Sequence, residues 1–530
     1  MKLVLLGKIL LTPSSIHTPH KVVMMKLAET LQKRGHKVVV WQIGLKRDGI
    51  PVPKGVEERF WRVDVKEPYI RDMLIYRNAS VFDHVWDEEI QETQKKAAYW
   101  MMSLRMCEVA LEQRKAEFDA MVEEEFDAVV VDDLYNPCGL LHTGLQKSIF
   151  VYYSMSAMRT ETAWSNQSPN PPSYIPVPGT GYSDIMDFWQ RGANALAFLK
   201  TIYIHHRIIL RRLDAVFQKF YPGVTEAFYM ERNASLNYIN TPPIFDFTRP
   251  YMPRTTWVGS LHCVNATKLP SGPLAEFVTK VDGEKGFIYV SMGQGVQWAR
   301  APQRIIDLFL STFKALPHLS FVWQYDGPAL SNLPSNVYTQ AWLPQQEVLG
   351  HSNLQGFVTS GGLNSVVESM FHGTPIVGIP VFAEGADNIA RASERSAGII
   401  LPKHQLTSAR LATAIKRIVK EPKFIEGAKL FQDLIHDVPY TELNHAVFWL
   451  EFITRHHEIP QARSGADDLN IFQYFLVDVI SFLIVCTLLI AYIIYTIIKY
   501  SMKATFWVLR KCLGLCFGQR TRSASKKKTE

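Results

Sequence analysis

Residues 342–398 decide the fold, and they read WLPQQEVLGHSNLQGFVTSGGLNSVVESMFHGTPIVGIPVFAEGADNIARASERSAG. Two runs within them, 354–359 and 375–380, have the character of strands in an α/β domain. The first run ends in a turn at 360–362, Ser-Gly-Gly, and a segment of helical character follows. Glycines let a backbone approach a phosphate closely, and the free N–H groups of a helix start favour an anion. This unit alone is a weak signal, because many α/β turns have the same form without a ligand.

Strands and helices alternate on both sides of this stretch. Hydrophobic patterning predicts a helix at about 21–33 and strands at 8–11, 37–42, 128–131, 149–153, 286–290 and 319–324. The alternation predicts an α/β fold of two facing Rossmann-like domains, an N-terminal domain at 8–255 and a C-terminal domain at 256–455. Ligands of such folds bind outside the carboxyl ends of the strands, so the cleft between the domains is the expected site. The long loop at 166–181, rich in Pro, Ser and Gly, is expected to roof it.

An apolar segment follows the two domains. Residues 474–498 read YFLVDVISFLIVCTLLIAYIIYTII and carry one charge, Asp478. About 20 apolar residues cross a bilayer as a helix, so this segment is predicted to be a transmembrane helix, between a linker at 456–473 and a basic tail at 499–530. A buried core helix is the alternative, and so unbroken an apolar run disfavours it. Acidic residues precede the segment and basic residues follow it, so the positive-inside rule predicts a cytosolic tail and a luminal body.

Two further patterns agree with a type I membrane protein of the endoplasmic reticulum. Four glycosylation sequons precede the apolar segment, at Asn78, Asn166, Asn233 and Asn265. The final KKTE, with lysines third and fourth from the end, resembles the dilysine signal that returns such proteins to the endoplasmic reticulum; the alternative is a generic basic tail. The N-terminus fits less well, because residues 1–7 form only a short or truncated signal-like segment before Lys8.

Charge and cysteine content exclude other classes. The net charge of +7 belongs to the tail, where nine Lys and Arg face one Glu. The rest of the chain is therefore close to neutral, and nothing in it predicts a nucleic-acid partner. Six cysteines are too few and too scattered for a disulfide framework. Three cysteines, Cys107, Cys138 and Cys263, precede the apolar segment and are expected to be buried thiols. Because their number is odd, at least one of them must be a free thiol.

Several separated motifs together resemble the UDP-glycosyltransferase family, which includes animal glucuronosyltransferases and glucosyltransferases. Besides 342–398, they are RGH at 34–36, AVFWLEF at 446–452, and DDL at 467–469 followed by Tyr474 and DVI at 478–480. The resemblance covers nearly the whole chain. It implies a GT-B-type fold, in which the N-terminal domain binds the acceptor and the C-terminal domain binds the UDP-sugar.

The resemblance also implies roles for residues of the donor site. Trp342 would stack on uracil, Gln345 would hydrogen-bond the base, and Glu368 would accept hydrogen bonds from both ribose hydroxyls. The alternatives are a core tryptophan and a solvated helix glutamate. Asn364 and the helix start would hold the diphosphate. The full set of expected donor-site residues is Ser291, Gly293, Gln294, Trp342, Gln345, Ser360, Gly361, Gly362, Asn364, Ser365, Glu368 and Glu384.

For catalysis, the resemblance points to His20, just before the first predicted helix. A neutral imidazole can take the proton of an acceptor hydroxyl as it attacks the anomeric carbon, and Asp132 would orient it. His17 and Asp133 are the neighbouring alternatives, and the spacing from His20 to the RGH motif favours His20. No cofactor and no metal are expected, because the UDP-sugar is a co-substrate and no His/Cys cluster has zinc spacing.

The chain departs from the family pattern at three positions. Ser360 occupies the position where the family has His. Glu384-Gly385 occupies the position where the family has Asp-Gln, and Gln294 the position where it has a small hydroxyl residue. The leading hypothesis is the inverting transfer of a hexose, glucose or glucuronic acid, from its UDP donor to a hydroxyl of a small lipophilic acceptor. The alternative is a weakly active or inactive UDP-binding relative that serves as a membrane partner subunit. The sequence leaves open a homo- or hetero-oligomer with related transferases.

Overall fold

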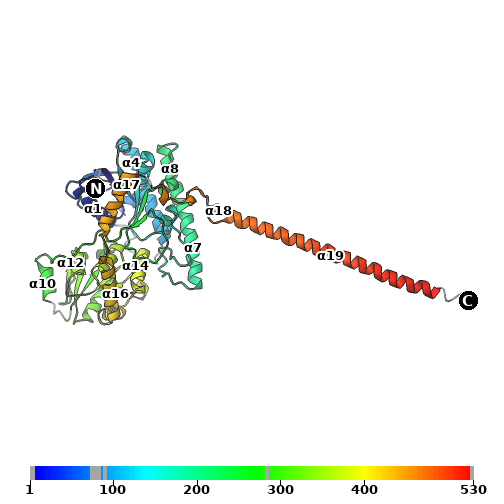
Figure 1. Cartoon of the computed structure of the whole chain (residues 1–530). Helices are drawn as coiled ribbons and strands as arrows, with labels where there is room; N and C mark the ends of the chain where they lie inside the picture. Colours follow the sequence, from blue (N-terminus) through cyan, green and yellow to red (C-terminus); the bar gives the residue numbers. More distant parts are fainter. Residues whose placement is uncertain (1–5, 72–84, 88–91, 281–285, 458, 526–530) are drawn as a thin grey trace. The chain divides into compact units, whose positions relative to one another are not determined.

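The computed structural model describes residues 6–71, 85–87, 92–280, 286–457 and 459–525. It divides into two compact units, one ending at Arg463 and one beginning at Ser464 (Figure 1). The first unit contains two parallel sheets, which form two lobes. The second contains the apolar segment. The predicted two Rossmann-like domains are therefore confirmed.

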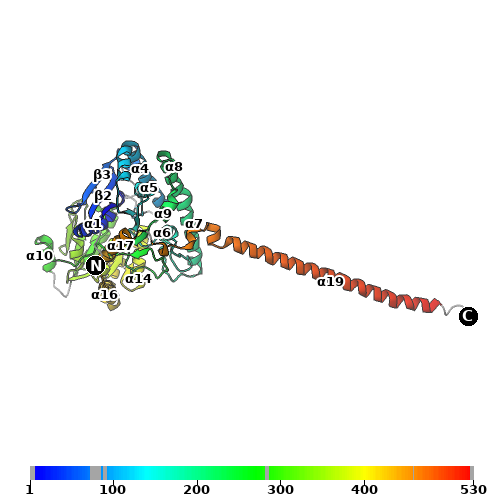
Figure 2. The same cartoon turned by 45° about the horizontal axis from the view of Figure 1, so that its top comes forward.

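The first lobe is built on a parallel sheet with the strand order β3-β2-β1-β4-β5-β6-β7. Figure 2 labels β2 and β3, which lie side by side in this sheet. Its described strands are β1 (Lys8–Thr12), β2 (Lys37–Gly44), β3 (Glu57–Arg62), β4 (Ala128–Asp132), β5 (Phe150–Ser154), β6 (Leu236–Ile239) and β7 (Thr255–Trp257). The order reverses between β1 and β4, which is the switch point where Rossmann folds bind ligands. The described helices of the first lobe are α1 (Thr18–Lys33), α2 (Pro68–Arg71), α4 (Glu92–Glu123), α5 (Pro137–Gln146), α6 (Thr160–Ser165), α7 (Phe188–Ile204), η2 (His205–Leu210), α8 (Arg211–Phe220) and α9 (Ala227–Arg232).

The second lobe repeats this arrangement with the order β10-β9-β8-β11-β12-β13. Its strands are β8 (Phe287–Ser291), β9 (Ser320–Gln324), β10 (Val337–Gln340), β11 (Leu354–Thr359), β12 (Ile376–Gly378) and β13 (Gly398–Ile400). The switch point here lies between β8 and β11, so the turn at 360–362 is at the ligand-binding edge. Its helical segments are α10 (Pro273–Thr279), η3 (Trp298–Arg300), α11 (Gln303–Lys314), α12 (Gln345–Leu349), α13 (Leu363–Phe371), α14 (Ala383–Glu394), η4 (Lys403–Gln405), α15 (Ser408–Lys420) and α16 (Pro422–His436).

The last long helix of the first unit, α17 (Glu442–His456), returns to the first lobe (Figure 1). Its apolar residues share a core with β1, β2 and α1. Glu451 accepts a hydrogen bond from Arg34 at 3.2 Å and lies 3.3 Å from Nε2 of His36. The AVFWLEF and RGH motifs therefore meet in space. The predicted domain 256–455 includes α17, whose apolar face packs into the core of the first lobe.

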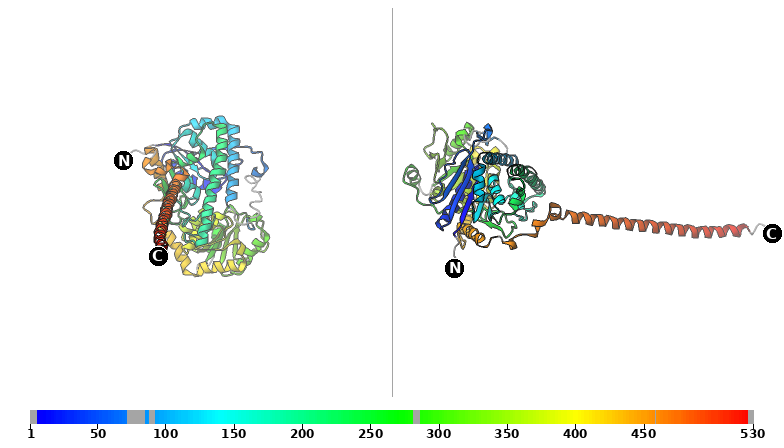
Figure 3. Two further views of the ribbon diagram at one scale, coloured as in Figure 1. Left: turned by 90° about the vertical axis from the view of Figure 1, so that its right-hand side faces the viewer. Right: turned by 90° about the horizontal axis from the view of Figure 1, so that it is seen from above.

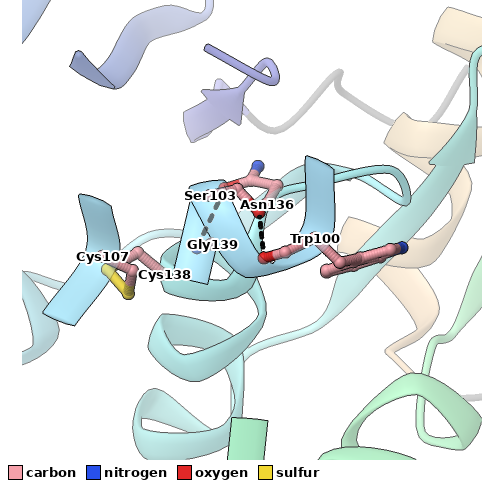
Figure 4. The surroundings of a disulfide bond; sticks show 6 residues. All are labelled: Trp100, Ser103, Cys107, Asn136, Cys138 and Gly139. Atoms are coloured by element: carbon pink, nitrogen blue, oxygen red, sulfur yellow. Dashed lines mark hydrogen bonds between the residues drawn. A yellow bond between two sulfur atoms is a disulfide. The ribbon is translucent and has the colours of Figure 1, made fainter. Parts of the chain in front are cut away.

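A disulfide joins Cys107 of α4 to Cys138 at the start of α5, with 5.5 Å between their Cα atoms (Figure 4). The prediction of buried thiols is therefore wrong for these two residues. Sequence could not reveal the pair, because only the packing of α4 on α5 brings the two side chains together. Cys263 remains a free thiol, so the expected unpaired cysteine of the body is confirmed.

The second unit contains η6 (Gly465–Asp468), α18 (Ile471–Tyr474) and α19 (Val477–Ser525); η5 (Pro460–Ala462) precedes it in the chain. Within α19, Val477–Leu515 is long and apolar enough to cross a membrane, and an 18-residue window of it has a mean hydropathy of 2.6. The transmembrane segment was predicted at 474–498, and the described helix begins at Val477 and ends at Ser525. Leu476, with φ of 55°, separates α18 from α19, and the helix continues beyond Lys499 into the tail. The segment is compatible with a single membrane span.

Candidate active site

His20 and Asp132 meet at the switch point of the first sheet. The helix α1 begins at Thr18, three residues earlier than predicted, so His20 lies in its first turn rather than before it. Nδ1 of His20 lies 2.8 Å from Oδ2 of Asp132. The buried Asp132 also accepts hydrogen bonds from the backbone N–H groups of Ser14, at 3.0 Å, and Leu134, at 3.1 Å. These donors fix the carboxylate that faces the imidazole.

The pKa of His20 lies above its ordinary value. Burial lowers it, but the charge and hydrogen bond of Asp132 outweigh burial, and Glu384 of the second lobe raises it further. A positive imidazole is therefore stabilised where a base would receive a proton.

The adjacent carboxylate, Asp133, faces away from His20. It pairs with Arg159 at 2.8 Å and accepts a hydrogen bond from Thr162 at 2.9 Å. Burial raises the pKa of Asp133 to about 6, against the lowering effect of Arg159. Asp133 follows the end of β4, and its contacts with Arg159 and Thr162 leave Asp132 as the carboxylate that reaches His20.

His17, the other histidine near α1, has a different environment. Its ring centroid lies 5.1 Å from that of His20, 5.6 Å from Tyr99 and 5.3 Å from Tyr135. Burial and the charge of His20 together lower the pKa of His17 to about 3, against the raising effect of Asp132. His17 is therefore a neutral member of an aromatic wall beside the His20–Asp132 pair.

A cavity of about 670 Å³ lies between the two lobes. It is lined by loops that follow the strands at both switch points. This size suits a small-molecule ligand. His20 and seven of the expected donor-site residues line it together: Gly293, Gln294, Ser360, Gly362, Asn364, Ser365 and Glu384.

A second cavity of about 240 Å³ shares Gly293 and Gln294 with the first, and Trp342 lines it. Trp342 is 62% exposed, so it is not a core tryptophan. Ser291 is buried at the end of β8, where its hydroxyl donates to Gln324 at 3.3 Å. Ser291 therefore supports the loop and does not line either cavity.

Glu368 and Gln345 line neither of the two cavities and belong to a partly buried polar network. Glu368 is only 8% exposed, so it is not a solvated helix residue. Nε2 of Gln345 donates to Oε2 of Glu368 at 2.6 Å and to Ser365 at 3.1 Å. The other carboxylate oxygen of Glu368 lies 3.2 Å from Nε2 of His262. Each oxygen of Glu368 thus has one partner within the protein and keeps further capacity to accept hydrogen bonds.

His262 was missed in the sequence, where nothing distinguishes it from other histidines. It is buried, and burial alone would lower its pKa. The neighbouring Cys263 and Glu368 instead raise the pKa of His262 well above its ordinary value. The 3.2 Å contact with His262, an ion pair when the imidazole is protonated, fixes the carboxylate of Glu368 at the second lobe's switch point.

The turn after β11 is held closely against α14. The hydroxyl of Ser360 donates to the carbonyl of Met292 at 2.9 Å, so its proton is directed to the neighbouring loop and not into the cavity. Gly361 has φ of 87°, and Asn388 donates to its carbonyl at 3.0 Å. A Cβ added to Gly385 would collide with the carbonyl of Ser360. This backbone contact requires glycine at 385, where the family pattern has glutamine.

The start of α13 faces the large cavity. Gly362 precedes the helix and has no side chain to cap it, and Gly362, Asn364 and Ser365 all line the cavity. Such a helix start attracts an anion through its free N–H groups and its dipole.

The loop predicted at 166–181 reaches the same cavity. The backbone N–H groups of Gly179 and Gly181 donate to the two oxygens of Asp387 on α14, at 2.6 and 2.9 Å. Pro178, next to them, lines the cavity. The loop is thus bound to the second lobe at its far end.

The chain matches relatives of one family along most of its length. The family model described as UDP-glucoronosyl and UDP-glucosyl transferase covers residues 7–512. UDP-glucuronosyltransferase 2B15 of Homo sapiens is 29% identical, over 99% of this chain and 96% of the relative. UDP-glucuronosyltransferase 2C1 of Oryctolagus cuniculus is 30% identical, over 89% of this chain and 94% of the relative.

Solved structures share the fold. The Phytolacca americana UGT2, complexed with UDP-2fluoro-glucose and pterostilbene, has a TM-score of 0.55 at 14% identity, over 85% of this chain and 100% of the other. The calicheamicin glycosyltransferase CalG4 has a TM-score of 0.55 at 18% identity, over 85% and 99%. From its two sheets and its match along residues 7–512, the chain belongs to the UDP-glucoronosyl and UDP-glucosyl transferase family and is a glycosyltransferase of the GT-B type.

Proposed function

We propose that the chain transfers a hexose, with inversion, from a UDP-sugar to a hydroxyl of a small lipophilic acceptor, and that His20 is the base. One observation carries this proposal: His20, whose Nδ1 lies 2.8 Å from Asp132, lines the same cavity as the start of α13. With Nδ1 bound to Asp132, Nε2 is left to take the acceptor's proton. The acceptor oxygen then attacks the anomeric carbon, and the bond to the UDP oxygen breaks.

The donor is proposed to lie along the second lobe. The diphosphate would meet the N–H groups at Gly361, Gly362 and Asn364, and its charge would be stabilised there as the bond breaks. Uracil would stack on the exposed Trp342, and Glu368 would bind the ribose. Oε1 of Gln294 is buried without a hydrogen-bond partner among the described residues, which suits an acceptor of a sugar hydroxyl proton.

Purified full-length chain, incubated with labelled UDP-glucose or UDP-glucuronate and a set of phenols, tests the function. The proposal requires an inverted glycoside from at least one donor. UDP binding of normal affinity without any product would instead support the inactive partner subunit. We also expect the same rate after treatment with EDTA, because the proposed chemistry requires no metal.

The His262–Glu368 ion pair yields a prediction about donor binding. Replacing His262 with glutamine leaves the carboxylate without its cationic partner, and the Kd of UDP should rise about tenfold, the usual effect of losing one charged hydrogen bond. The value of kcat should change little. Calorimetric titration with UDP measures the effect, and the exposed His404→Gln is the matched control. Equal UDP affinity in the two variants would show that His262 does not position Glu368.

We propose that α19 anchors the protein in the endoplasmic reticulum membrane with the first unit in the lumen. Disulfides persist in oxidising compartments, so the Cys107–Cys138 bond supports a luminal location. The asymmetry of charge around the span supports the same orientation.

The sequons test this topology. Asn233 and Asn265 are exposed, Asn166 is 1% exposed, and Asn78 lies outside the described residues. A glycan on Asn166 cannot be accommodated in this fold. In the folded protein, Asn233→Gln and Asn265→Gln should each increase gel mobility by one glycan, whereas Asn166→Gln should have no effect. If neither of the first two variants shifts and glycosidase changes nothing, the luminal orientation is wrong.

A further inference from the structure

The first lobe lines the large cavity with more cations than anions. Figure 3 (left) shows the two lobes one above the other, and the cavity is lined from both. Among the described Lys, Arg, Asp and Glu residues of the first lobe that line it, four are cationic and one is anionic. The cations are Lys46, Arg47, Lys96 and Arg159, and the anion is Asp48. This wall of the cavity therefore attracts a negatively charged group of a ligand.

The carboxylates that pair with these cations do not line the cavity. Arg159 pairs with Asp133 at 2.8 Å and with Glu161 at 2.9 Å. Arg47 pairs with Glu58. These three carboxylate residues are absent from the described lining of the cavity, whereas both arginines belong to it. The positive members of the pairs are thus the ones that a ligand in the cavity would meet.

Lys96 continues the aromatic wall that begins beside the proposed base. It lies on α4 one turn before Tyr99, so the two residues share a face of the helix, and both line the cavity. The ring of Tyr99 lies 5.6 Å from that of His17, which lies 5.1 Å from that of His20. A base, an aromatic surface and a cation therefore follow one another along the cavity.

The charge of Lys96 is held in place by the network around Arg159. Lys96 is half-buried, and Glu161 is buried. Burial raises the pKa of Glu161, but the charges of Lys96 and Arg159 outweigh burial and lower this pKa to about 2. Glu161 is therefore ionised near neutral pH and stabilises a protonated Lys96. A lysine ammonium has three N–H donors, so Lys96 can bind an anion of the ligand while Glu161 balances its charge.

We propose that the acceptor is an aromatic hydroxy acid, whose hydroxyl lies at His20, whose ring lies along His17 and Tyr99, and whose carboxylate binds Lys96. This assignment narrows the acceptor class and rests on the proposed function. The charge-assisted hydrogen bond to Lys96 offsets the cost of removing the carboxylate from water. A neutral phenol would use the same aromatic wall without this bond and would bind more weakly.

Two acceptors of the same shape test the assignment. One is a hydroxybiphenyl with a carboxylate at the end opposite the hydroxyl, and the other is the corresponding neutral carboxamide. With the full-length chain and the UDP-sugar that it uses, the KM for the carboxylate should be about tenfold lower, the usual effect of one hydrogen bond to a charged group. Lys96→Met should abolish this difference with little change in kcat, and Lys96→Arg should keep most of it. Equal KM values in the parent chain, or an undiminished difference in Lys96→Met, would overturn the proposal.

A control variant and UDP affinity separate this role from others. Lys115 lies on the same helix, pairs with Asp119 at 2.8 Å and is not among the described lining residues. Lys115→Met should therefore leave the difference between the two acceptors unchanged. The diphosphate is proposed to bind the second lobe, so Lys96→Met should also leave the Kd of UDP unchanged. A tenfold weaker UDP affinity in Lys96→Met would assign the lysine to the donor and contradict the proposal.

The position of the sugar on the product gives an independent readout. With the carboxylate at Lys96, the sugar should be attached to the hydroxyl, and the product should resist hydroxylamine. A sugar ester, which hydroxylamine cleaves, would place the carboxylate at His20 and overturn the proposal.

Binding of the carboxylate acceptor to the UDP-loaded chain requires no turnover, and calorimetry measures it. If this binding depends on Lys96 but no acceptor yields a product, the proposed function fails and the carboxylate site at Lys96 stands. If products form but the carboxylate binds no better than the carboxamide, the function stands and the carboxylate site is refuted.

Discussion

Replacing His20 with alanine is expected to lower kcat/KM by about 10²–10⁴-fold, the usual contribution of a positioned general base. The variant removes the only group in the proposed mechanism that takes the acceptor's proton. UDP affinity and the free energy of unfolding should stay close to those of the parent chain, because His20 lies across the cavity from the donor residues. Steady-state kinetics and UDP calorimetry measure both quantities. Full activity in this variant would refute the mechanism and spare the fold.

The pH dependence adds a second readout for the same pair. His20 must be neutral to act as a base, and Asp132 helps to raise its pKa above the ordinary value. The rate should therefore rise with pH through this raised pKa. Asp132→Asn removes the charge that favours the imidazolium. The acidic side of the plot of rate against pH, which we call the acid limb, should therefore move to lower pH, and the maximal rate should fall. His17→Phe should leave the limb in place, because the pKa of His17 is already about 3. An acid limb that does not move in Asp132→Asn would contradict the assignment.

Replacing Cys138 with serine should lower the free energy of unfolding by about 3–4 kcal/mol. The bond closes a loop between residues 31 apart, and its loss returns conformational freedom to the unfolded chain. The bond also ties α4 to the start of α5, where Asn136 caps the helix by accepting the N–H of Gly139 at 3.1 Å (Figure 4). Urea unfolding of the full chain in detergent measures the loss.

Dithiothreitol supplies the control for this prediction. The reductant should destabilise the parent chain by the same amount and should leave Cys138→Ser unchanged. Equal stability of the parent chain with and without reductant would show that the bond contributes nothing to folding.

The sequence was sufficient for the features that depend on local pattern. Apolar runs separated by helices predicted both parallel sheets, and the Ser-Gly-Gly turn was correctly placed at the end of a strand. The match of His20 and Asp132 to family positions predicted their contact, with Asp133 as the neighbouring alternative. In the structure, Asp133 instead contacts Arg159 and Thr162.

Features that depend on long-range packing could not be predicted. The disulfide, the return of α17 to the first lobe, and the His262–Glu368 pair each join segments that are far apart in the chain. The direction of the Ser360 hydroxyl depends on the neighbouring loop at Met292. In each case the partner is chosen by the assembled sheets and not by neighbouring residues.

A structure of the full-length chain with UDP bound is the most direct test. We expect the β-phosphate against the backbone of Gly361 and Gly362, uracil on the face of Trp342, and the open side of the phosphate turned toward His20. UDP bound at any other place, or a closed gap between that turn and His20, would contradict the account.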